Sequence, residues 1–263
     1  MVHSTDIPAV LDLLLGFLRR EFNTRYLGSI SGLLWVLIHP VALLLLYGFL
    51  FGTVFQTRLP GVPPELLLAY VAVALWPWLM FSEGLSRATL AVQEHAALLG
   101  KVAVPAGLLV IANLAATFIL HTVGYLFALA VLWLLGYPLQ PVGMFAALLG
   151  IGLLFVLTLG LALLTSALQV LIRDLAQILS QLLGFWFFLT PVLYGRAQLP
   201  EALHPWFDLN PISFYAESAR WAWLGRGTLE WSQLGAALLT ALLVFLLGYW
   251  VFRRLRPHFE DFL

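Results

Sequence analysis

The sequence predicts an all-α integral membrane protein with six transmembrane helices. Of its 263 residues, 62% are apolar and only 10% are charged, whereas about 25% are charged in typical soluble proteins. A helix needs about 20 mostly apolar residues to cross the hydrocarbon core of a membrane. Six segments meet this requirement: Leu33–Phe55, Leu66–Leu85, Val102–Leu135, Val142–Ile172, Leu175–Tyr194 and Leu234–Phe252. A water-soluble fold is therefore excluded.

Residues 1–28 precede the first span, and we expect them to form a cytoplasmic amphipathic helix at the membrane surface. Apolar residues recur there at three- and four-residue spacing, as in Leu11, Leu15 and Leu18. Charged residues such as Arg19 and Arg25 would each cost roughly 2.5 to 3.5 kcal/mol at the bilayer centre. This segment therefore does not cross. That this helix is a surface anchor with no further role is as well supported as a functional role for it. Residues 29–263 are predicted to form the transmembrane domain.

The spans differ in what interrupts them. The first holds no formal charge, and the second contains Pro77 and, near its end, Glu83. The polar stretch 86–105 then predicts a short cytoplasmic helix that could dock a partner, with an ordinary connecting loop as the alternative. Pro138 and Pro141 separate the third and fourth spans. A very short turn at Arg173 and Asp174, a second cytoplasmic point, separates the fourth from the fifth.

Residues 191–232, between the fifth and sixth spans, contain four prolines and are too long for a simple loop. Asn210 and Pro211 form an N-cap and first-turn pair, and Gly225 is placed to end the helix that they begin. Aromatic residues in this helix, among them Tyr215 and Trp221, favour burial in the membrane interface.

Both chain ends are predicted to be cytoplasmic. Lys and Arg near the span ends are retained on the cytoplasmic side. Nine lie on the side of the termini (Arg19, Arg20, Arg25, Arg87, Lys101, Arg173, Arg253, Arg254 and Arg256) and four on the other (Arg58, Arg196, Arg220 and Arg226). We expect no cleavable secretory signal, because the first eighteen residues carry no Lys or Arg.

Several classes of site and partner are not predicted. Lys and Arg number 13, as do Asp and Glu, so no basic excess suggests nucleic acid. There are no cysteines, and the six histidines are scattered, which argues against a metal site. Lys101 is the only lysine, and Val102 follows it. The chain therefore lacks a phosphate-binding loop and cannot be its own ATPase. We expect no catalytic residue and no cofactor in this chain.

Polar and aromatic residues also recur on helical faces within the spans. Asn113, Thr117 and His121 are spaced four apart, and Tyr47 and Phe51 form a similar stripe. Polar faces turn inward in a bundle, either to bond between helices or to line a wet conduit. Aromatic rings inside spans either pack the bundle or offer a stacking surface to sugar rings. Both alternatives stay open.

The order of short motifs resembles a known family. An amphipathic helix ends in Arg19-Arg20-Glu21-Phe22-Asn23-Thr24-Arg25-Tyr26-Leu27-Gly28-Ser29, followed by Gly32-Leu33-Leu34-Trp35 and Pro40. Later come Arg173-Asp174, Thr190-Pro191-Val192-Leu193-Tyr194, Leu199-Pro200, Asn210-Pro211 and Phe252-Arg253. Over essentially the whole chain, this pattern is similar to the transmembrane permease of bacterial ATP-binding-cassette exporters of O-antigen, capsule and teichoic acid. The family usually has Asn where this chain has His39.

The resemblance implies a homodimer of six-span subunits in the bacterial inner membrane, with two separate ATPase subunits that hold ATP and Mg. It implies ATPase coupling by Arg87, Glu94, His95, Lys101, Arg173 and Asp174. It implies a pair of re-entrant helices as an outer gate, with Pro191, Tyr194, Asn210, Pro211, Tyr215 and Trp221. It also implies an aromatic sugar conduit at the dimer interface, formed by Trp35, Tyr47, Phe51, Trp76, Trp78, Phe81, Gln181, Phe185, Trp186 and Phe188. Arg19, Arg20 and Arg25 would bind a lipid-linked diphosphate at the cytoplasmic opening, because guanidinium groups match phosphate geometry.

The function that follows is ATP-driven export of lipid-linked or lipid-capped polysaccharide. A permease for a small amphiphile or drug is the alternative within the same class. An ion-coupled secondary carrier would need ionisable residues in mid-membrane, and only His39, Glu83 and His121 qualify. A membrane enzyme would need a catalytic cluster, and we find none in the sequence.

Overall fold

The computed structural model describes residues 7–26, 32–54, 59–99, 104–195, 199–227 and 229–262. Within these ranges the fold is built from helices joined by short turns, with no β-strand. The long helices are α1 (Ile7–Tyr26), α2 (Gly32–Phe49), α3 (Leu67–Glu94), α5 (Ala106–Leu134), α6 (Met144–Leu171), α7 (Leu175–Leu189) and α10 (Trp231–Leu255). The all-α prediction is confirmed.

Five helical segments of the described chain are long and apolar enough to cross a membrane: Leu34–Val54, Pro64–Glu94, Ala106–Leu134, Pro141–Leu171 and Trp231–His258. They match five of the six predicted spans. The fifth predicted span is a shorter helix, because α7 has only 15 residues and ends at Leu189. At 1.5 Å per residue such a helix covers about 22 Å, which is less than the hydrocarbon thickness of about 30 Å.

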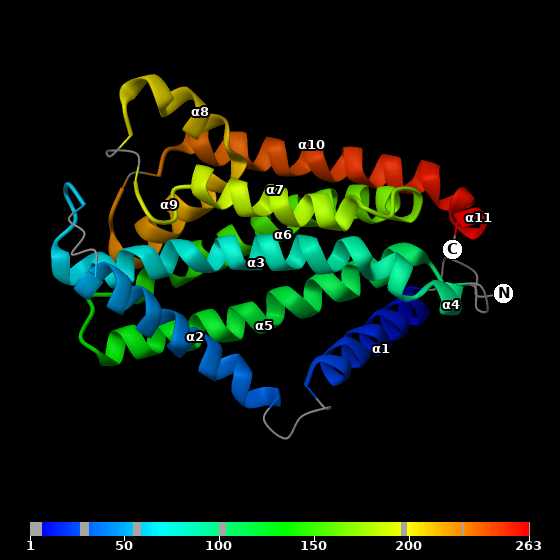
Figure 1. The fold of residues 1–263 in the computed structure, drawn as a ribbon, viewed down its shortest axis with the longest axis horizontal. Coiled ribbons are helices and arrows are strands. Elements are labelled where there is room, and N and C mark those ends of the chain that lie inside the picture. The colour runs from blue at the N-terminus through cyan, green and yellow to red at the C-terminus, as the bar shows by residue number, and fades with distance from the viewer. Residues whose placement is uncertain are drawn as a thin grey trace.

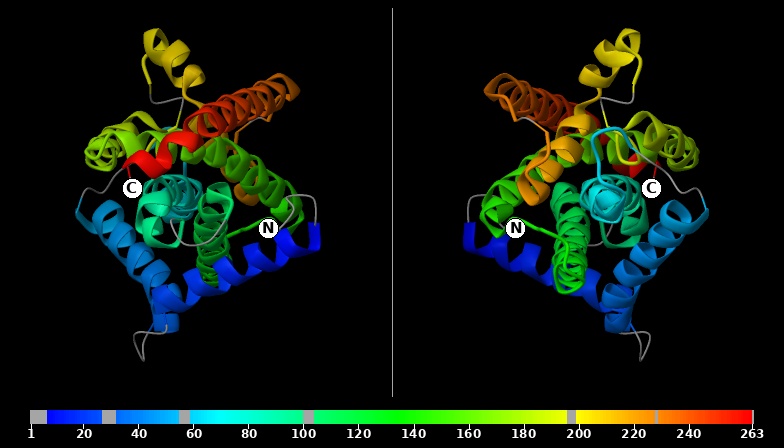
Figure 2. Two further views of the ribbon diagram at one scale, coloured as in Figure 1. Left: turned by 90° about the vertical axis from the view of Figure 1, so that its right-hand side faces the viewer. Right: turned by 90° about the vertical axis from the view of Figure 1, so that its left-hand side faces the viewer.

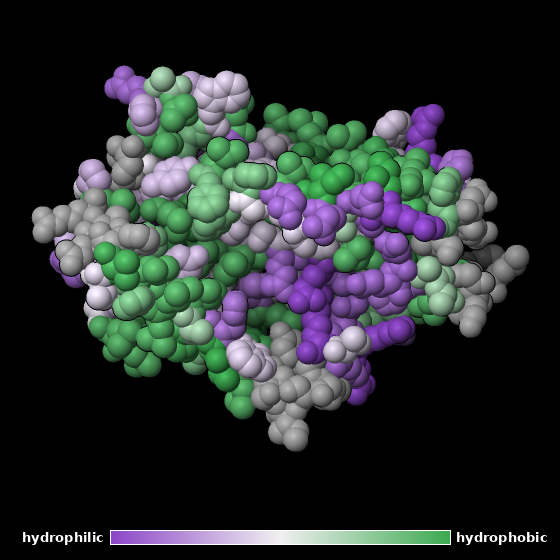
Figure 3. Space-filling view, viewed as in Figure 1, coloured by the Kyte–Doolittle hydropathy of each residue, from purple (hydrophilic) through white to green (hydrophobic). Residues whose placement is uncertain are grey.

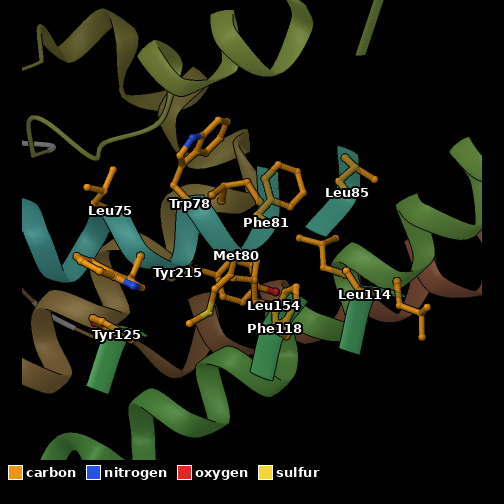
Figure 4. Packing of buried hydrophobic residues seen from close by; sticks show 14 of the residues in the cluster. Leu75, Trp78, Met80, Phe81, Leu85, Leu114, Phe118, Tyr125, Leu154 and Tyr215 are labelled. Carbon is orange, nitrogen blue, oxygen red and sulfur yellow. The ribbon is translucent and has the colours of Figure 1, made fainter. Parts of the chain in front are cut away.

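Helix α3 occupies the middle of the bundle and contacts α5, α6, α7 and, further along the chain, α9 (Pro211–Leu224) (Figure 1). Apolar side chains from these helices form one core, in which Met80, Phe81 and Leu154 are fully buried (Figure 4). Pro77 lies inside α3 without ending it. The separate short helix predicted over 86–105 is instead largely a continuation of the preceding span: α3 runs to Glu94, and the short α4 (Ala96–Leu99) follows. The stretch after Ser86 contains no proline and consists mainly of good helix formers.

Helix α10 packs along α6, the most extensive helix pair of the bundle. Gly160 and Gly248 face each other at this crossing, where an added Cβ on either glycine would collide with the backbone of the opposite helix. The two backbones approach this closely because neither residue has a side chain.

The segment between α7 and α10 contains α8 (His204–Leu209) and α9 (Pro211–Leu224). The Asn210 side chain accepts a hydrogen bond from the Ile212 N–H, and Gly225 ends α9 in the left-handed conformation with φ of 59°. The predicted start and end of this helix are therefore confirmed. Helix α9 packs against α3 and α6. It lies at the end of the molecule opposite the start of α1 and the end of α10 (Figures 1 and 2).

Candidate functional site

A cavity of about 1000 Å³, which we call the inner cavity, lies between α1, α2, α3 and α5. Its lining is strongly polar for a membrane protein, and Figure 3 shows hydrophilic residues gathered around a hollow on this face. Charged and imidazole side chains in the lining are Arg20, Glu21, Arg25, His39, Glu83, Arg87, Glu94, His95 and His121. Trp35, Trp76, Asn113 and Thr117 also contribute.

Arg25 connects α1 to α5 at one wall of the inner cavity. Its guanidinium donates to Thr117 Oγ1 at 2.8 Å, to Glu21 Oε2 at 3.2 Å and to the Asn113 carbonyl at 3.2 Å. Burial lowers the pKa of Arg25 from its ordinary value, nearby Arg87 lowers it further, and Glu21 raises it. The guanidinium remains charged at neutral pH, because arginine side chains are not deprotonated in proteins. Arg25 thus holds the C-terminal end of α1 against the bundle.

Glu83 forms the centre of a second group on α3. Its carboxylate accepts from Arg87 Nε at 2.7 Å and lies 2.9 Å from Nε2 of His121 on α5. The spacing of Glu83 and Arg87 in the sequence, four residues apart on one helix, suits such a neutralising pair. It did not reveal the pairing with His121, which lies 38 residues further along the chain.

The arginines predicted to bind a diphosphate differ in position. Arg20 and Arg25 line the inner cavity, whereas Arg19 is exposed outside its lining. Arg25 is bonded as described, so Arg20 is the lining arginine whose guanidinium has no partner within the described part of the chain. The structure therefore brings together Arg20 and Arg87 as the more accessible cations.

The residues assigned to ATPase coupling fall into two groups. Arg87, Glu94 and His95 line the inner cavity, while Arg173 and Asp174 are exposed in the turn between α6 and α7. Gln169 braces that turn, since its amide donates to the Arg173 carbonyl at 2.9 Å and accepts from the Ala176 N–H at 2.7 Å. Lys101 lies outside the described residues.

The residues predicted to line the sugar conduit also fall into two groups, one buried and one exposed. Trp76, Trp78 and Phe81 are buried: Trp76 stacks on Tyr125 with centroids 5.7 Å apart, and Phe81 meets Trp186 edge-on at 5.2 Å. Within one chain these rings therefore pack the core, and only Trp76 also reaches the inner cavity. By contrast, Gln181, Phe185 and Phe188 on α7 and Trp35 on α2 are exposed, and Tyr47 stacks on Phe51 at 6.0 Å.

Asn210 joins α7 to α9 at the outer end. Besides capping α9, its side chain accepts from Trp186 Nε1 at 3.0 Å and donates to Thr190 Oγ1 at 3.1 Å. The Tyr194 hydroxyl donates to the Phe188 carbonyl at 2.9 Å. The remaining predicted gate residues differ in exposure, because Pro191 and Tyr215 are buried whereas Trp221 is 38% exposed.

Sequence reasoning missed Arg220, a fully buried residue of α9. Its guanidinium donates to Glu217 at 2.9 Å, to the Val192 carbonyl at 2.8 Å and to the Tyr70 carbonyl at 3.2 Å. It also lies 3.9 Å from the centroid of the Tyr70 ring, a cation–π contact. The available signal was the charged pair Glu217 and Arg220, three residues apart in an aromatic helix.

Chemically, the inner cavity suits a charged, polar group carried on an apolar chain. Cationic side chains can hold phosphate oxygens, and apolar helices surround the polar lining. Across the described ranges, no group of three or more His, Cys, Asp or Glu is arranged to hold a metal ion.

The chain is similar to known transport proteins. The family described as ABC-2 type transporter matches residues 13–224. The O-antigen export system permease protein RfbA of Myxococcus xanthus is 33% identical over 211 residues, which cover 76% of this chain and 75% of that protein. An RfbA of Klebsiella pneumoniae is 22% identical over 98% of this chain and 97% of its own length. The polysialic acid transport protein KpsM of Escherichia coli is 22% identical over 89% of this chain and 90% of its own length. This chain therefore belongs to the ABC-2 type transporter family.

Proposed function

We propose that this chain is the permease subunit of an exporter that moves a lipid-linked or lipid-capped polysaccharide outward across the bacterial inner membrane. Membership of the family and the names of the relatives support this function. The structural observation that carries it is the inner cavity, which holds three arginines among apolar helices. Such a site would bind the diphosphate of a lipid carrier through Arg20 and Arg87.

In this proposal α7 makes the fifth of six crossings, and both chain ends lie in the cytoplasm. Helix α7 alone is too short to span the hydrocarbon core, so α7 and the turns after it would span the membrane together. The chain continues from Thr190 to Gly195 without entering another helix. Helices α8 and α9 would form the re-entrant outer gate. The bonds of Asn210 to Trp186 and Thr190 would keep this gate in register with α7.

Two copies of the chain would enclose the conduit. Helix α7 supports this arrangement, because only Leu183 among its residues is buried while Phe185 and Phe188 are about 70% exposed. A second copy would cover these rings, and they would then face sugar units passing between the subunits. Trp35, Tyr47, Phe51 and Gln181 would extend the same surface.

As an ABC transporter subunit, the chain works with an ATPase partner. We assign two ATPase subunits, which hold ATP and Mg, to the cytoplasmic side. Arg173 and Asp174 would contact them directly, since both are exposed in the turn after α6. Arg87, Glu94 and His95 would instead link the inner cavity to that surface through the end of α3.

The test compares Arg20→Gln with Arg19→Gln in inside-out vesicles that hold the complete exporter. Arg20→Gln should lower ATP-driven uptake of a polyprenyl-diphosphate-linked polysaccharide about tenfold at low substrate concentration, because it removes a charge-assisted contact. Arg19→Gln, which removes the neighbouring charge outside the cavity, should behave as the wild type. Equal effects of the two substitutions would contradict binding at the inner cavity.

A further inference from the structure

Gln169, near the end of α6, is a polar side chain buried inside the bundle. Only 1% of its surface is exposed, yet its amide makes three hydrogen bonds. Nε2 donates to Gln93 Oε1 at 3.0 Å and to the Arg173 carbonyl at 2.9 Å, and Oε1 accepts from the Ala176 N–H at 2.7 Å. These partners lie on three segments: α3, the turn after α6 and the first turn of α7. One amide therefore joins three segments, at the end of the molecule where α10 also ends (Figure 1).

The bond to Ala176 replaces a missing cap at the start of α7. The first N–H groups of a helix have no partner within that helix and need an acceptor from outside it. Asp174 occupies the N-cap position, but its side chain makes no capping hydrogen bond. The Gln169 amide oxygen supplies an acceptor from α6 instead, and Asp174 stays exposed at the surface.

The bond to Gln93 belongs to a polar contact between α3 and α6 that repeats after one helical turn. Thr89 Oγ1 lies 2.7 Å from Thr165 Oγ1, and Gln93 bonds to Gln169 four residues further along both helices. The two helices are therefore parallel and in a fixed register here. The next residue of α3, Glu94, lines the inner cavity. This contact thus holds one wall of the inner cavity to α6.

These bonds make the turn, the end of α3 and the start of α7 one unit. The turn cannot shift relative to α3 or α7 unless the Gln169 amide loses a partner, and a buried amide without its partners is costly. A force applied at the exposed residues Arg173 and Asp174 would therefore reach two places. Helix α3 would carry it to the inner cavity, and α7 would carry it to the exposed rings of Phe185 and Phe188.

We propose that Gln169 is a positioning residue that couples the ATPase subunits to the inner cavity. It transmits movement of the turn at Arg173 and Asp174 to α3 and α7 together. This inference rests on the proposed function, in which the ATPase subunits contact that turn. It adds that the turn, the cavity wall and α7 move as one body during export, and that this motion depends on one buried amide.

Packing between the helices is the competing explanation for Gln169. An apolar side chain of similar size, such as leucine, would fill the same space and preserve the contact between α3 and α6. Packing alone therefore predicts that a leucine variant still exports. Loss of the three hydrogen bonds predicts instead a complex that hydrolyses ATP without moving its substrate.

The first experiment compares Gln169→Leu with Ser166→Ala in the complete exporter, reconstituted in vesicles with its ATPase subunits. Gln169→Leu should lower ATP-driven uptake of a polyprenyl-diphosphate-linked polysaccharide about tenfold, in the range typical of coupling between sites, while ATP hydrolysis stays near the wild-type rate. Ser166→Ala is the matched control and should behave as the wild type, because Ser166 is equally buried on α6 but donates to the Leu163 carbonyl of its own helix. Normal uptake by Gln169→Leu, or a parallel loss of uptake and hydrolysis, would overturn the inference.

A disulfide tests the rigid unit while Gln169 is kept. The chain has no cysteine, so Thr89→Cys combined with Thr165→Cys places one pair of thiols per chain where the two hydroxyl oxygens lie 2.7 Å apart. Oxidation should leave uptake unchanged, because the inference requires no sliding between α3 and α6. Loss of uptake on oxidation, restored by a thiol reductant, would show that the two helices must slide and would refute the rigid unit. Failure of the proposed function is distinguishable, since the wild type would then show no ATP-driven uptake either.

Discussion

Arg220 shows how a charged residue can be accommodated inside the bundle. Its guanidinium is fully buried, yet it has partners on three segments: Glu217 on its own helix, Tyr70 on α3 and Val192 after α7. Because the guanidinium is planar and has five N–H donors, it can bond to acceptors on several segments at once. Arg220 therefore fastens α9 to two neighbours at once.

Replacing Arg220 by Met should destabilise the exporter by about 3 kcal/mol, because buried acceptors on two segments lose a charged donor. The measurement is the thermal unfolding midpoint of the purified complex in detergent. Arg226→Met is the matched control, since the Arg226 side chain is exposed and its guanidinium donates to the Gly61 carbonyl at 3.3 Å. A similar, small shift in both variants would show that the buried contacts contribute little.

The aromatic residues predicted to line the conduit should respond differently to truncation. Trp76→Ala should cost about 3 to 5 kcal/mol of stability, because it removes a core ring that is 2% exposed. Phe185→Ala should leave stability nearly unchanged, since this ring is 70% exposed, and should instead lower polysaccharide export. Unfolding midpoints and vesicle uptake, measured on both variants, separate the two effects. Wild-type export by Phe185→Ala would assign Phe185 to packing or lipid contact.

Helix α10 depends on its crossing with α6. Gly248→Ala should destabilise the complex by roughly 1 to 3 kcal/mol, because the added Cβ would meet the Gly160 carbonyl and force the backbones apart. Gly235→Ala on the same helix has no atom within 4 Å of the added Cβ and should be neutral or slightly stabilising. Thermal unfolding of both variants checks the contrast. An equal response would mean that the two helices separate without cost.

Elements defined by local chemistry could be predicted from the sequence. Helix α9 begins and ends where Asn210, Pro211 and Gly225 indicate, since cap preferences act within a few residues. The continuation of α3 beyond Ser86 could not be predicted from polarity. Arg87 and Glu94 are accommodated in α3 because they line the inner cavity. Without knowledge of that cavity, polar residues in a membrane protein suggest a loop between spans.

Contacts between distant segments were also beyond prediction. Arg25 bonds to Asn113 and Thr117 across about ninety residues, and nothing in either helix alone specifies the other. The four-residue spacing of Asn113, Thr117 and His121 predicted an inward polar face but left open whether it packs or lines a conduit. In the structure this face bonds to Arg25 and Glu83 and also lines the inner cavity.

At the scale of the whole molecule, two spans are poorly covered by the chain itself. Only 11% of the apolar window of Leu34–Val54 and 17% of that of Trp231–His258 are buried, against 78% for the span that contains α3. Lipid or a second copy must cover the remaining apolar surface. A homodimer that places α2 and α7 at its interface would account for part of it and would leave α10 to lipid.

We infer that this chain shapes the path while another polypeptide supplies the energy. The direct measurement is uptake of a fluorescent lipid-linked polysaccharide by inside-out vesicles that hold the chain with or without its ATPase partner. Uptake should require both the partner and ATP, and a proton or sodium gradient should not replace them. Uptake by the chain alone, driven by such a gradient, would contradict the account and indicate an ion-coupled carrier.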